Sequence, residues 1–354
     1  MLNQTLKQLF FGLLLLSSTV SYSQHEALLQ KGFDQLKTSG DEVLYFEHQA
    51  LRSPKLSFRS LNESSEELPV LQVISYHHMP ILGYNTKTET YYSPEKLSLD
   101  NNQEQFQIRL QPNIRTRFGY FADPYEVKLG LILDTRVYLA SGLSLIGGLE
   151  IPIQNNLDNQ SAALRPAPSM LNYMRKLSES DYIALSSGLF FVDRYGFDLE
   201  YRHQKLFSNW SYGFEASYTG FYRFNGFRYT TSSFSSLSFI ADLEYQMPFE
   251  NLSLRLSAGR WLFEDFGFRV DLNRRFNKVE YGLYAASTDF GSSAGFQFAC
   301  QLFPGVIGKH KKVLLRSTEE FRYKYSYESQ LPAARRFQKS IPRLADILRN
   351  FNLK

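Results

Sequence analysis

The sequence predicts a mainly β protein: a transmembrane antiparallel β-barrel of about twelve strands, with a small N-terminal α/β module and a C-terminal basic helix. Residues 104–304 alternate apolar and polar side chains with period two, the pattern of strands. Their segments are close to the roughly 9–11 residues that cross a bilayer as a tilted strand. The chain has 30 Phe and 23 Tyr in 354 residues, yet its mean hydropathy is only −0.31. A wall that is apolar on one face and polar on the other produces this combination.

Residues 1–23 have the features of a secretory signal peptide. Lys7 supplies the positive charge, an apolar run covers residues 9–16, and residues 21–23 form a small-residue cleavage site before Gln24. A retained membrane anchor is the alternative, but the run is shorter than the roughly 20 residues that a span needs. The single cysteine, Cys300, excludes a disulfide framework and a cysteine-based zinc site. We therefore expect an exported protein.

Residues 24–103 predict a separate module that is too polar to enter lipid. His25–Lys37 has helical spacing of its apolar residues, and Gly40 ends that pattern. Three extended segments are expected after it, at 42–48, 54–61 and 68–76. We expect this α/β module to lie in the periplasm.

The barrel wall is clearest in the segment 124–139. Apolar side chains occupy one face, and charged residues and glycine occupy the other, with Ile132 out of character there. The apolar face comprises Tyr125, Val127, Leu129, Leu131, Leu133 and Val137, and the polar face Glu126, Lys128, Gly130, Asp134 and Arg136. The twelve predicted strands lie near 105–118, 124–139, 142–153, 167–177, 181–193, 196–206, 209–223, 234–248, 251–262, 266–276, 278–288 and 294–303. An even number is typical of bacterial single-chain barrels.

A soluble β-sandwich also alternates, but a dry sandwich core could not bury the many charges of the inner face. Aromatic residues cluster at segment ends, as in the interfacial girdles of barrels. They are Phe118, Tyr120, Phe121, Phe221, Tyr222, Phe224, Trp261 and Phe263. The two longest polar connections, 154–166 and 223–233, both follow odd-numbered strands, so we expect them at the cell exterior.

Residues 305–354 form a basic tail, with 12 Lys or Arg against 4 Asp or Glu from Lys309 onward. Leu344, Ile347, Leu348 and Phe351 share a helical face, with Ser340 as a candidate cap and Pro342 in the first turn. Such a helix could lie on an anionic membrane surface, dock on a partner or pack on the mouth of the barrel. Nucleic acid is not an expected partner of an exported protein.

No catalytic, cofactor or metal site is predicted. His203 is the only histidine in the barrel region, and His77 and His78 would point to opposite faces of a strand. A Gly-x-Ser-x-Gly elbow and a phosphate-cradling loop are both absent from the sequence. Cys300 shares an apolar face with Phe296 and Phe298, where we expect it to meet lipid.

Motifs near the end of the predicted barrel resemble the YjbH/GfcD family. They are Gly-Arg-Trp-Leu-Phe-Glu-Asp-Phe-Gly at 259–267, Leu-Asn-Arg-Arg-Phe-Asn-Lys-Val-Glu-Tyr-Gly at 272–282 and Ala-Ala-Ser-Thr-Asp at 285–289. Residues 29–33 and 41–47 are similar to the family's periplasmic module. The resemblance implies an outer-membrane β-barrel encoded with exopolysaccharide and capsule export genes. Typical members are about twice as long, with further strands.

Within these motifs, Asp265 and Gly267 are expected to form a tight turn that needs an Asx cap and a φ-permissive glycine. Arg260, Arg274 and Arg275 could pair with Asp265 or Asp289. The candidate structural and lumen residues are Lys128, Asp134, Arg136, Arg260, Asp265, Gly267, Arg269, Asp271, Arg275 and Asp289.

The expected function is non-enzymatic, in exopolysaccharide or capsule secretion or assembly. The expected partners are outer-membrane lipid, surface polysaccharide and other export proteins. Two alternatives stay open at this point: a channel for small solutes and a hydrolase carried on the barrel.

Overall fold

The computed structural model describes most of the predicted barrel, part of the N-terminal module and much of the tail. The described residues are 33–39, 43–48, 71–76, 79–92, 94, 106–118, 125–157, 163–205, 208–225, 228–248, 251–276, 279–302, 306–310, 313–318, 320–328 and 332–349. The signal peptide, the segment at 54–61 and the His77–His78 pair lie outside them. In these parts of the chain, no helix is long and apolar enough to cross a membrane.

The N-terminal module contains a five-stranded sheet in the order β1-β2-β3-β4-β5, with β2 and β3 parallel and the other pairs antiparallel. Its strands are β1 (Phe33–Ser39), β2 (Val43–His48), β3 (Leu71–Tyr76), β4 (Met79–Asn85) and β5 (Thr90–Tyr92). The helix predicted over residues 25–37 is wrong from Phe33 onward, because the backbone there pairs with β2. The strands predicted at 42–48 and 68–76 are confirmed.

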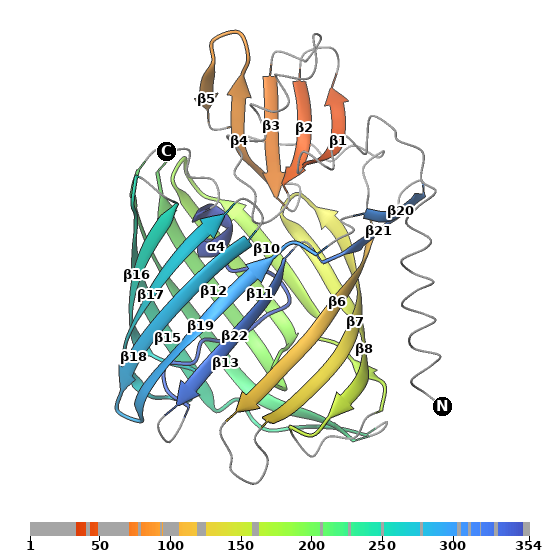
Figure 1. Ribbon diagram of the computed structural model, residues 1–354. Coiled ribbons are helices and arrows are strands. Elements are labelled where there is room, and N and C mark those ends of the chain that lie inside the picture. Colours follow the sequence, from red (N-terminus) through yellow and green to blue (C-terminus); the bar gives the residue numbers. More distant parts are fainter. Residues whose placement is uncertain are drawn as a thin grey trace.

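A second, larger sheet curves round into a barrel-like wall, and the N-terminal sheet lies at one of its ends (Figure 1). Each of the twelve predicted segments is a strand. They are β6 (Phe106–Phe118), β7 (Tyr125–Ala140), β8 (Leu143–Asn155), β10 (Met170–Lys176), β11 (Asp181–Phe190), β12 (Arg194–Gln204), β13 (Trp210–Asn225), β15 (Ser236–Gln246), β16 (Leu252–Arg260), β17 (Phe266–Phe276), β18 (Val279–Thr288) and β19 (Gly291–Cys300). Two short strands, β9 (Arg165–Pro166) and β14 (Arg228–Thr231), pair antiparallel with β8 and β13.

The expected start of the tail at residue 305 is wrong, because three more strands follow. They are β20 (Val306–His310), β21 (Val313–Ser317) and β22 (Phe321–Glu328). The last of them pairs with β19 along its whole length, so it is a thirteenth long strand of the described wall. Its aromatic residues alternate with Arg322, Lys324 and Ser326, the same period-two pattern as the other strands.

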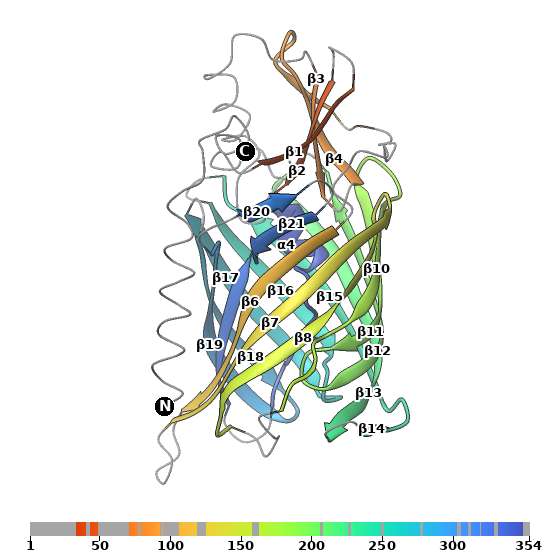
Figure 2. The ribbon, with the colours of Figure 1, turned by 90° about the vertical axis from the view of Figure 1, so that its right-hand side faces the viewer.

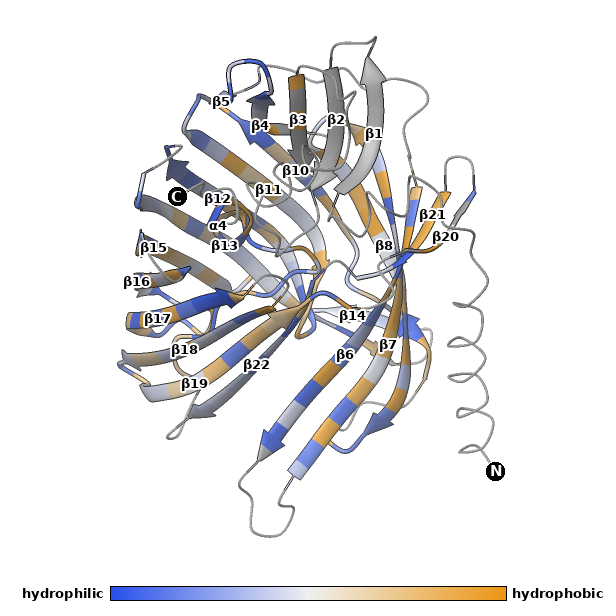
Figure 3. Ribbon diagram, turned by 45° about the horizontal axis from the view of Figure 1, so that its top comes forward, coloured by the Kyte–Doolittle hydropathy of each residue, from blue (hydrophilic) through white to orange (hydrophobic). Residues whose placement is uncertain are grey.

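The expected even number of strands fails with this addition, and so does the expected closed cylinder. After thirteen alternating strands, β22 runs in the same direction as β6. β21 pairs with the first half of β6 in parallel, whereas no ladder joins β22 to β6 among the residues that the structure describes. A side-chain hydrogen bond between Thr116 and Tyr323 spans this seam. The separation of the β6 and β22 ribbons is visible in the oblique view of Figure 3.

The two faces of the wall differ as the alternation predicts. In β15, Leu237 and Phe239 are about half exposed on the outside, while Ser238 and Asp242 are buried inside. β17 carries an exposed aromatic residue at each end, Phe266 and Phe276, as expected for two interfacial girdles.

Three expected girdle residues face the interior instead: Trp261 is fully buried, Tyr222 nearly so, and Phe263 packs against a buried cluster that includes Phe337. Trp261 follows the end of β16, in the turn before β17, and the ring packs there with buried Ile240 and Ala286. The described flanks of the two long polar connections, with β14, lie at the end of the wall opposite the N-terminal sheet (Figure 2).

Gly267 is required by a close approach of two strands. A Cβ atom there would lie 2.1 Å from the carbonyl oxygen of Ser287 and 2.6 Å from the Cα of Thr288. Gly267 was expected to supply a positive φ to the turn, and this expectation is wrong. The residue of that turn with a positive φ is Glu264 (72°).

We expect Gly267→Ala to destabilise the folded barrel by about 1–3 kcal/mol, since backbone atoms must move to admit the methyl group. Urea unfolding of the protein in detergent micelles measures this. Gly308→Ala is the matched control, because a Cβ at Gly308 meets no atom within 4 Å. Equal loss of stability in both chains would contradict the packing argument.

Candidate functional site: the lumen and its plug segment

The inner face of the wall carries ion pairs between neighbouring strands, within one strand and across an intervening strand. Arg109 on β6 donates from Nε to Asp134 Oδ1 on β7 at 2.7 Å, and both side chains are buried. Arg202 on β12 pairs with Asp242 and with Glu244 on β15. Further wall pairs join Arg165 to Glu150, Arg255 to Glu244, Arg269 to Asp271 and Arg322 to Glu280. These pairs offset the cost of burying charge, because each guanidinium lies against a carboxylate.

Five of the candidate lumen residues lie on this inner face, and all five are buried. They are Lys128, Asp134, Arg136, Arg269 and Asp271. Arg269 pairs with Asp271, and its guanidinium also lies over the ring of Tyr284, 3.6 Å from the centroid. A cation over an aromatic face is stabilised by the ring quadrupole.

The pairings expected around the Asp265 turn are not formed. Arg260 pairs with Glu264 instead, at 2.9 Å. Asp289 accepts a hydrogen bond from the backbone N–H of Phe266 at 2.8 Å. Asp265 is fully buried, and its Oδ2 accepts from the backbone N–H of Ala334 at 2.8 Å. The carboxylate thus holds a part of the chain 69 residues further on.

Ala334 belongs to a segment that runs inside the barrel, here called the plug segment (residues 333–349). Its last six residues form the helix α4 (Leu344–Arg349), every residue of which is buried. The helix lies within the ring of strands, near the end that carries the N-terminal sheet (Figures 1 and 3). The tail helix is confirmed in type for Leu344, Ile347 and Leu348. Of the three expected positions, packing on the mouth of the barrel is nearest to the observed one, but α4 is buried inside the wall and is not a solvated helix.

Lys339 is the central charge of the plug segment. Its Nζ lies 2.7 Å from Asp198 Oδ2 and also contacts Glu200, both on β12. Although burial opposes the charge, these two carboxylates raise the pKa of the Lys339 ammonium above its ordinary value. The other oxygen of Glu200 accepts from the backbone N–H of Leu344 at 2.6 Å, where α4 begins. A carboxylate at this position accepts a hydrogen bond from a backbone N–H that has no partner within the helix. Its negative charge is also stabilised by the positive end of the helix dipole.

Two arginines of the plug segment share one carboxylate of the wall. Arg336 and Arg343 donate to the two oxygens of Glu215, at 2.9 and 2.6 Å. Glu215 on β13 lies directly opposite Glu200 on β12 in the strand register. Like charges in that position destabilise a sheet, so the cations of the plug segment offset a repulsion that the wall itself contains.

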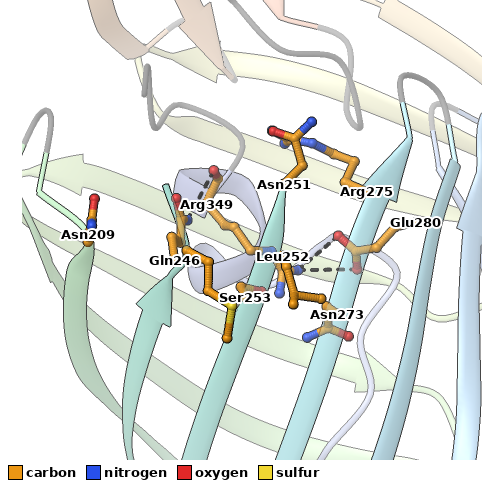
Figure 4. Close-up of a pocket in the computed structure, with 10 residues that line it drawn as sticks. Asn209, Gln246, Asn251, Leu252, Ser253, Asn273, Arg275, Glu280 and Arg349 are labelled. Atoms are coloured by element: carbon orange, nitrogen blue, oxygen red, sulfur yellow. Dashed lines mark hydrogen bonds and ion pairs between the residues drawn. The ribbon is translucent and has the colours of Figure 1, made fainter. Parts of the chain in front are cut away.

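Arg349 closes the end of the lumen next to the N-terminal sheet. It pairs with Glu280 at 3.2 Å and with Glu244 at 3.4 Å, and its carbonyl accepts from Gln246. A small polar pocket beside it is lined by residues of β15, β16, β17 and β18, by the turn between β15 and β16, and by Asn209 just before β13 (Figure 4). Arg275, a candidate lumen residue, is among its lining residues, so it contributes to the mouth of the barrel.

Apolar contacts anchor the other part of the plug segment. Phe337 stacks edge-on against Phe190, with centroids 4.5 Å apart. Phe337 and Ile341 join Ile146, Met170 and Leu262 in one buried cluster. The plug segment is therefore held both by ion pairs and by apolar packing, with water excluded from the contact.

His203 stacks on Tyr212, and its Nδ1 lies 2.8 Å from Asp181 in a partly exposed position. Across the described ranges, no group of three or more His, Cys, Asp or Glu side chains is arranged to hold a metal ion.

Comparison with known proteins supports the motif resemblance. A model of the YjbH family, described as exopolysaccharide biosynthesis protein YbjH, matches residues 167–298. This confirms the resemblance over that segment, which contains the motifs at 259–267, 272–282 and 285–289 and stops before the plug segment. The comparison with curated proteins gave no match. Among solved structures, the chain is similar to OmpTdeltaL8, a loop L8 deletion mutant of OmpT, an outer membrane protein of Vibrio cholerae, with a TM-score of 0.35 and 8% identity over 65% of this chain and 94% of that chain.

Proposed function

We propose that this chain, which resembles the YjbH family over residues 167–298, is an outer-membrane β-barrel protein that acts in exopolysaccharide secretion or assembly without catalysing a reaction. The single observation that carries the proposal is the two-faced wall. Its exposed face is apolar with aromatic residues at strand ends, and its inner face is a network of buried charges. A lipid bilayer outside and a polar path inside account for both faces. The family match supplies the link to exopolysaccharide.

In this proposal the N-terminal sheet is periplasmic, the long connections face the exterior, and the partners are outer-membrane lipid, the polysaccharide and other export proteins. The plug segment fills the lumen in the resting state. This favours a gated or assembly role over a permanently open channel for small solutes, the second candidate.

Deletion of the gene is expected to abolish or strongly reduce surface exopolysaccharide, and the full chain is expected to restore it. Surface polysaccharide is measured by extraction and sugar analysis, and the chain is located by fractionation of the envelope. Heat-modifiable migration of the purified protein on a gel tests the barrel. Unchanged polysaccharide in the deletion strain would refute the proposed function.

The hydrolase alternative depends on His203, since other histidines lie outside the predicted wall. We expect His203→Ala to leave exopolysaccharide amount and chain length unchanged, because the ring only stacks on Tyr212 and contacts Asp181 at the surface of the barrel. Size-exclusion analysis of the secreted polymer measures this. A shift to longer polymer in the variant, with normal amounts of folded protein, would favour the hydrolase.

A further inference from the structure

We propose that the plug segment occupies, within the same chain, the place of a cationic passenger: the lumen is built to accept a glycan that bears free amino groups. This rests on the proposed function and names its substrate class. The proposal follows from a difference between two sets of charged side chains on the wall. One set keeps its ion-pair partners when the plug segment leaves, and the other set loses them.

Two arginines at the centre of the wall network, Arg202 and Arg255, keep carboxylate partners on the wall itself. Arg202 keeps Asp242 and Glu244, and Arg255 keeps Glu244 at 2.8 Å after losing its contact with Asp346 of α4. The main ion pairs of the wall therefore survive displacement of the plug segment.

Three carboxylates of the wall do depend on it, here called the acidic trio (Asp198, Glu200 and Glu215). Among the described residues, their direct ion pairs are all with Lys339, Arg336 or Arg343. Two of the three face one another across β12 and β13. Displacement therefore exposes negative charge on these two strands, while the wall pairs of Arg202 and Arg255 remain in place.

A passenger that replaces the plug segment must supply cations at these positions, since unpaired charges in a confined lumen are costly. The cationic side chains of the plug segment that pair with the wall are spread along it, at positions 336, 339, 343 and 349, and their partners lie on β12, β13, β15 and β18. Among polysaccharides, one with free amines presents cations repeatedly along an extended chain. A neutral or anionic glycan supplies none.

The fluorescence of Trp261 is expected to change when the plug segment is displaced. Trp261 is fully buried, it shares a cluster with Ala334, and the guanidinium of Arg336 lies 5.6 Å from its ring. The chain has one other tryptophan, Trp210, which is exposed on the outside of the wall. In a Trp210→Phe background, the fluorescence of the full chain in detergent therefore reports the surroundings of the plug segment.

The test titrates this chain with a short glucosamine oligosaccharide and with its fully N-acetylated counterpart, at a mildly acidic pH that keeps the amines protonated. We expect a saturable change in Trp261 emission with the amino form and none with the acetylated form. Glu200→Gln with Glu215→Gln should weaken the response about tenfold or more, the loss expected for removed charge pairs. Glu126→Gln, at a rim pair with Arg117, is the matched control and should change nothing.

A second variant, Lys339→Gln with Arg343→Gln, covers the case in which the plug segment of the native chain binds too tightly for an oligosaccharide to displace it. These two substitutions remove ion pairs to the wall and so loosen the plug segment. If neither chain distinguishes the two oligosaccharides, the inference is overturned. It is also overturned if the loosened chain binds a peptide of residues 333–349 but not the amino oligosaccharide, since the lumen would then be specific for polypeptide. These outcomes leave the proposed function standing, because that is decided by the deletion strain.

Discussion

Replacing Lys339 by Gln is expected to destabilise the folded protein by about 3–5 kcal/mol, the range for removing one partner of a buried charge pair. The ammonium lies between Asp198 and Glu200, and all three side chains are buried. Without it, the two carboxylates on β12 face a neutral amide in a site from which water is excluded. Glutamine can donate hydrogen bonds, but it cannot offset two negative charges.

Urea unfolding in detergent micelles, followed by Trp261 fluorescence, measures this loss. Lys205→Gln is the matched control, because Lys205 lies at the end of the same strand and is exposed. Lys339→Arg should keep most of the stability, since it keeps the charge. Adding Asp198→Asn and Glu200→Gln to Lys339→Gln should recover part of the loss, because no buried charge then lacks a partner. Failure of this rescue would show that Lys339 acts through packing and not through charge.

The wall could be predicted from the sequence because successive side chains of a strand point to opposite faces of the wall. The apolar and polar residues of 124–139 therefore show, from the local sequence alone, which side chains point outward and which point inward. The same pattern is present in Phe321–Glu328, but it lies within a stretch whose excess of basic residues indicated a tail. The excess of basic residues over the whole C-terminal stretch thus led to the prediction of a tail, although the period-two alternation of residues 321–328 by itself predicts a strand.

The lumen site could not be predicted, because its contacts join residues far apart in the chain. Lys339 and Asp198 are 141 residues apart, and Asp265 and Ala334 are 69 apart. The spacing of Leu344, Ile347 and Leu348 predicts a helix correctly, but an apolar face is equally suited to a membrane surface and to the inside of a barrel. The only local indication was complementary charge: basic residues in the tail and carboxylates on the predicted inner face.

In the N-terminal sheet, the local sequence pattern predicted the wrong type of element. Phe33 and Leu36 have helical spacing, yet β1 pairs with β2. Short segments have weak intrinsic preferences, and the hydrogen bonds of a neighbouring strand outweigh them.

Deletion of residues 329–354 is expected to raise the conductance of the protein in planar bilayers at least about tenfold, since a wall of this many strands encloses more space than its own side chains fill. The deletion differs physically from Lys339→Gln. With the plug segment gone, water enters the lumen and hydrates Asp198, Glu200 and Glu215, so the cost of unpaired charge falls. We therefore expect the truncated chain to fold, and its current to be carried mainly by cations, which the newly exposed carboxylates attract.

The matched control ends the chain after Arg349, which keeps α4 and its pairs with Glu244 and Glu280. This chain should conduct no better than the full protein. Replacing Glu200 and Glu215 by Gln in the truncated chain should reduce the preference for cations while the conductance stays high, because the opening depends on the plug segment and the selectivity on the carboxylates. Equal conductance of the full and truncated chains would mean that something other than residues 333–349 blocks the path. A high conductance without cation preference would mean that the acidic trio does not line it.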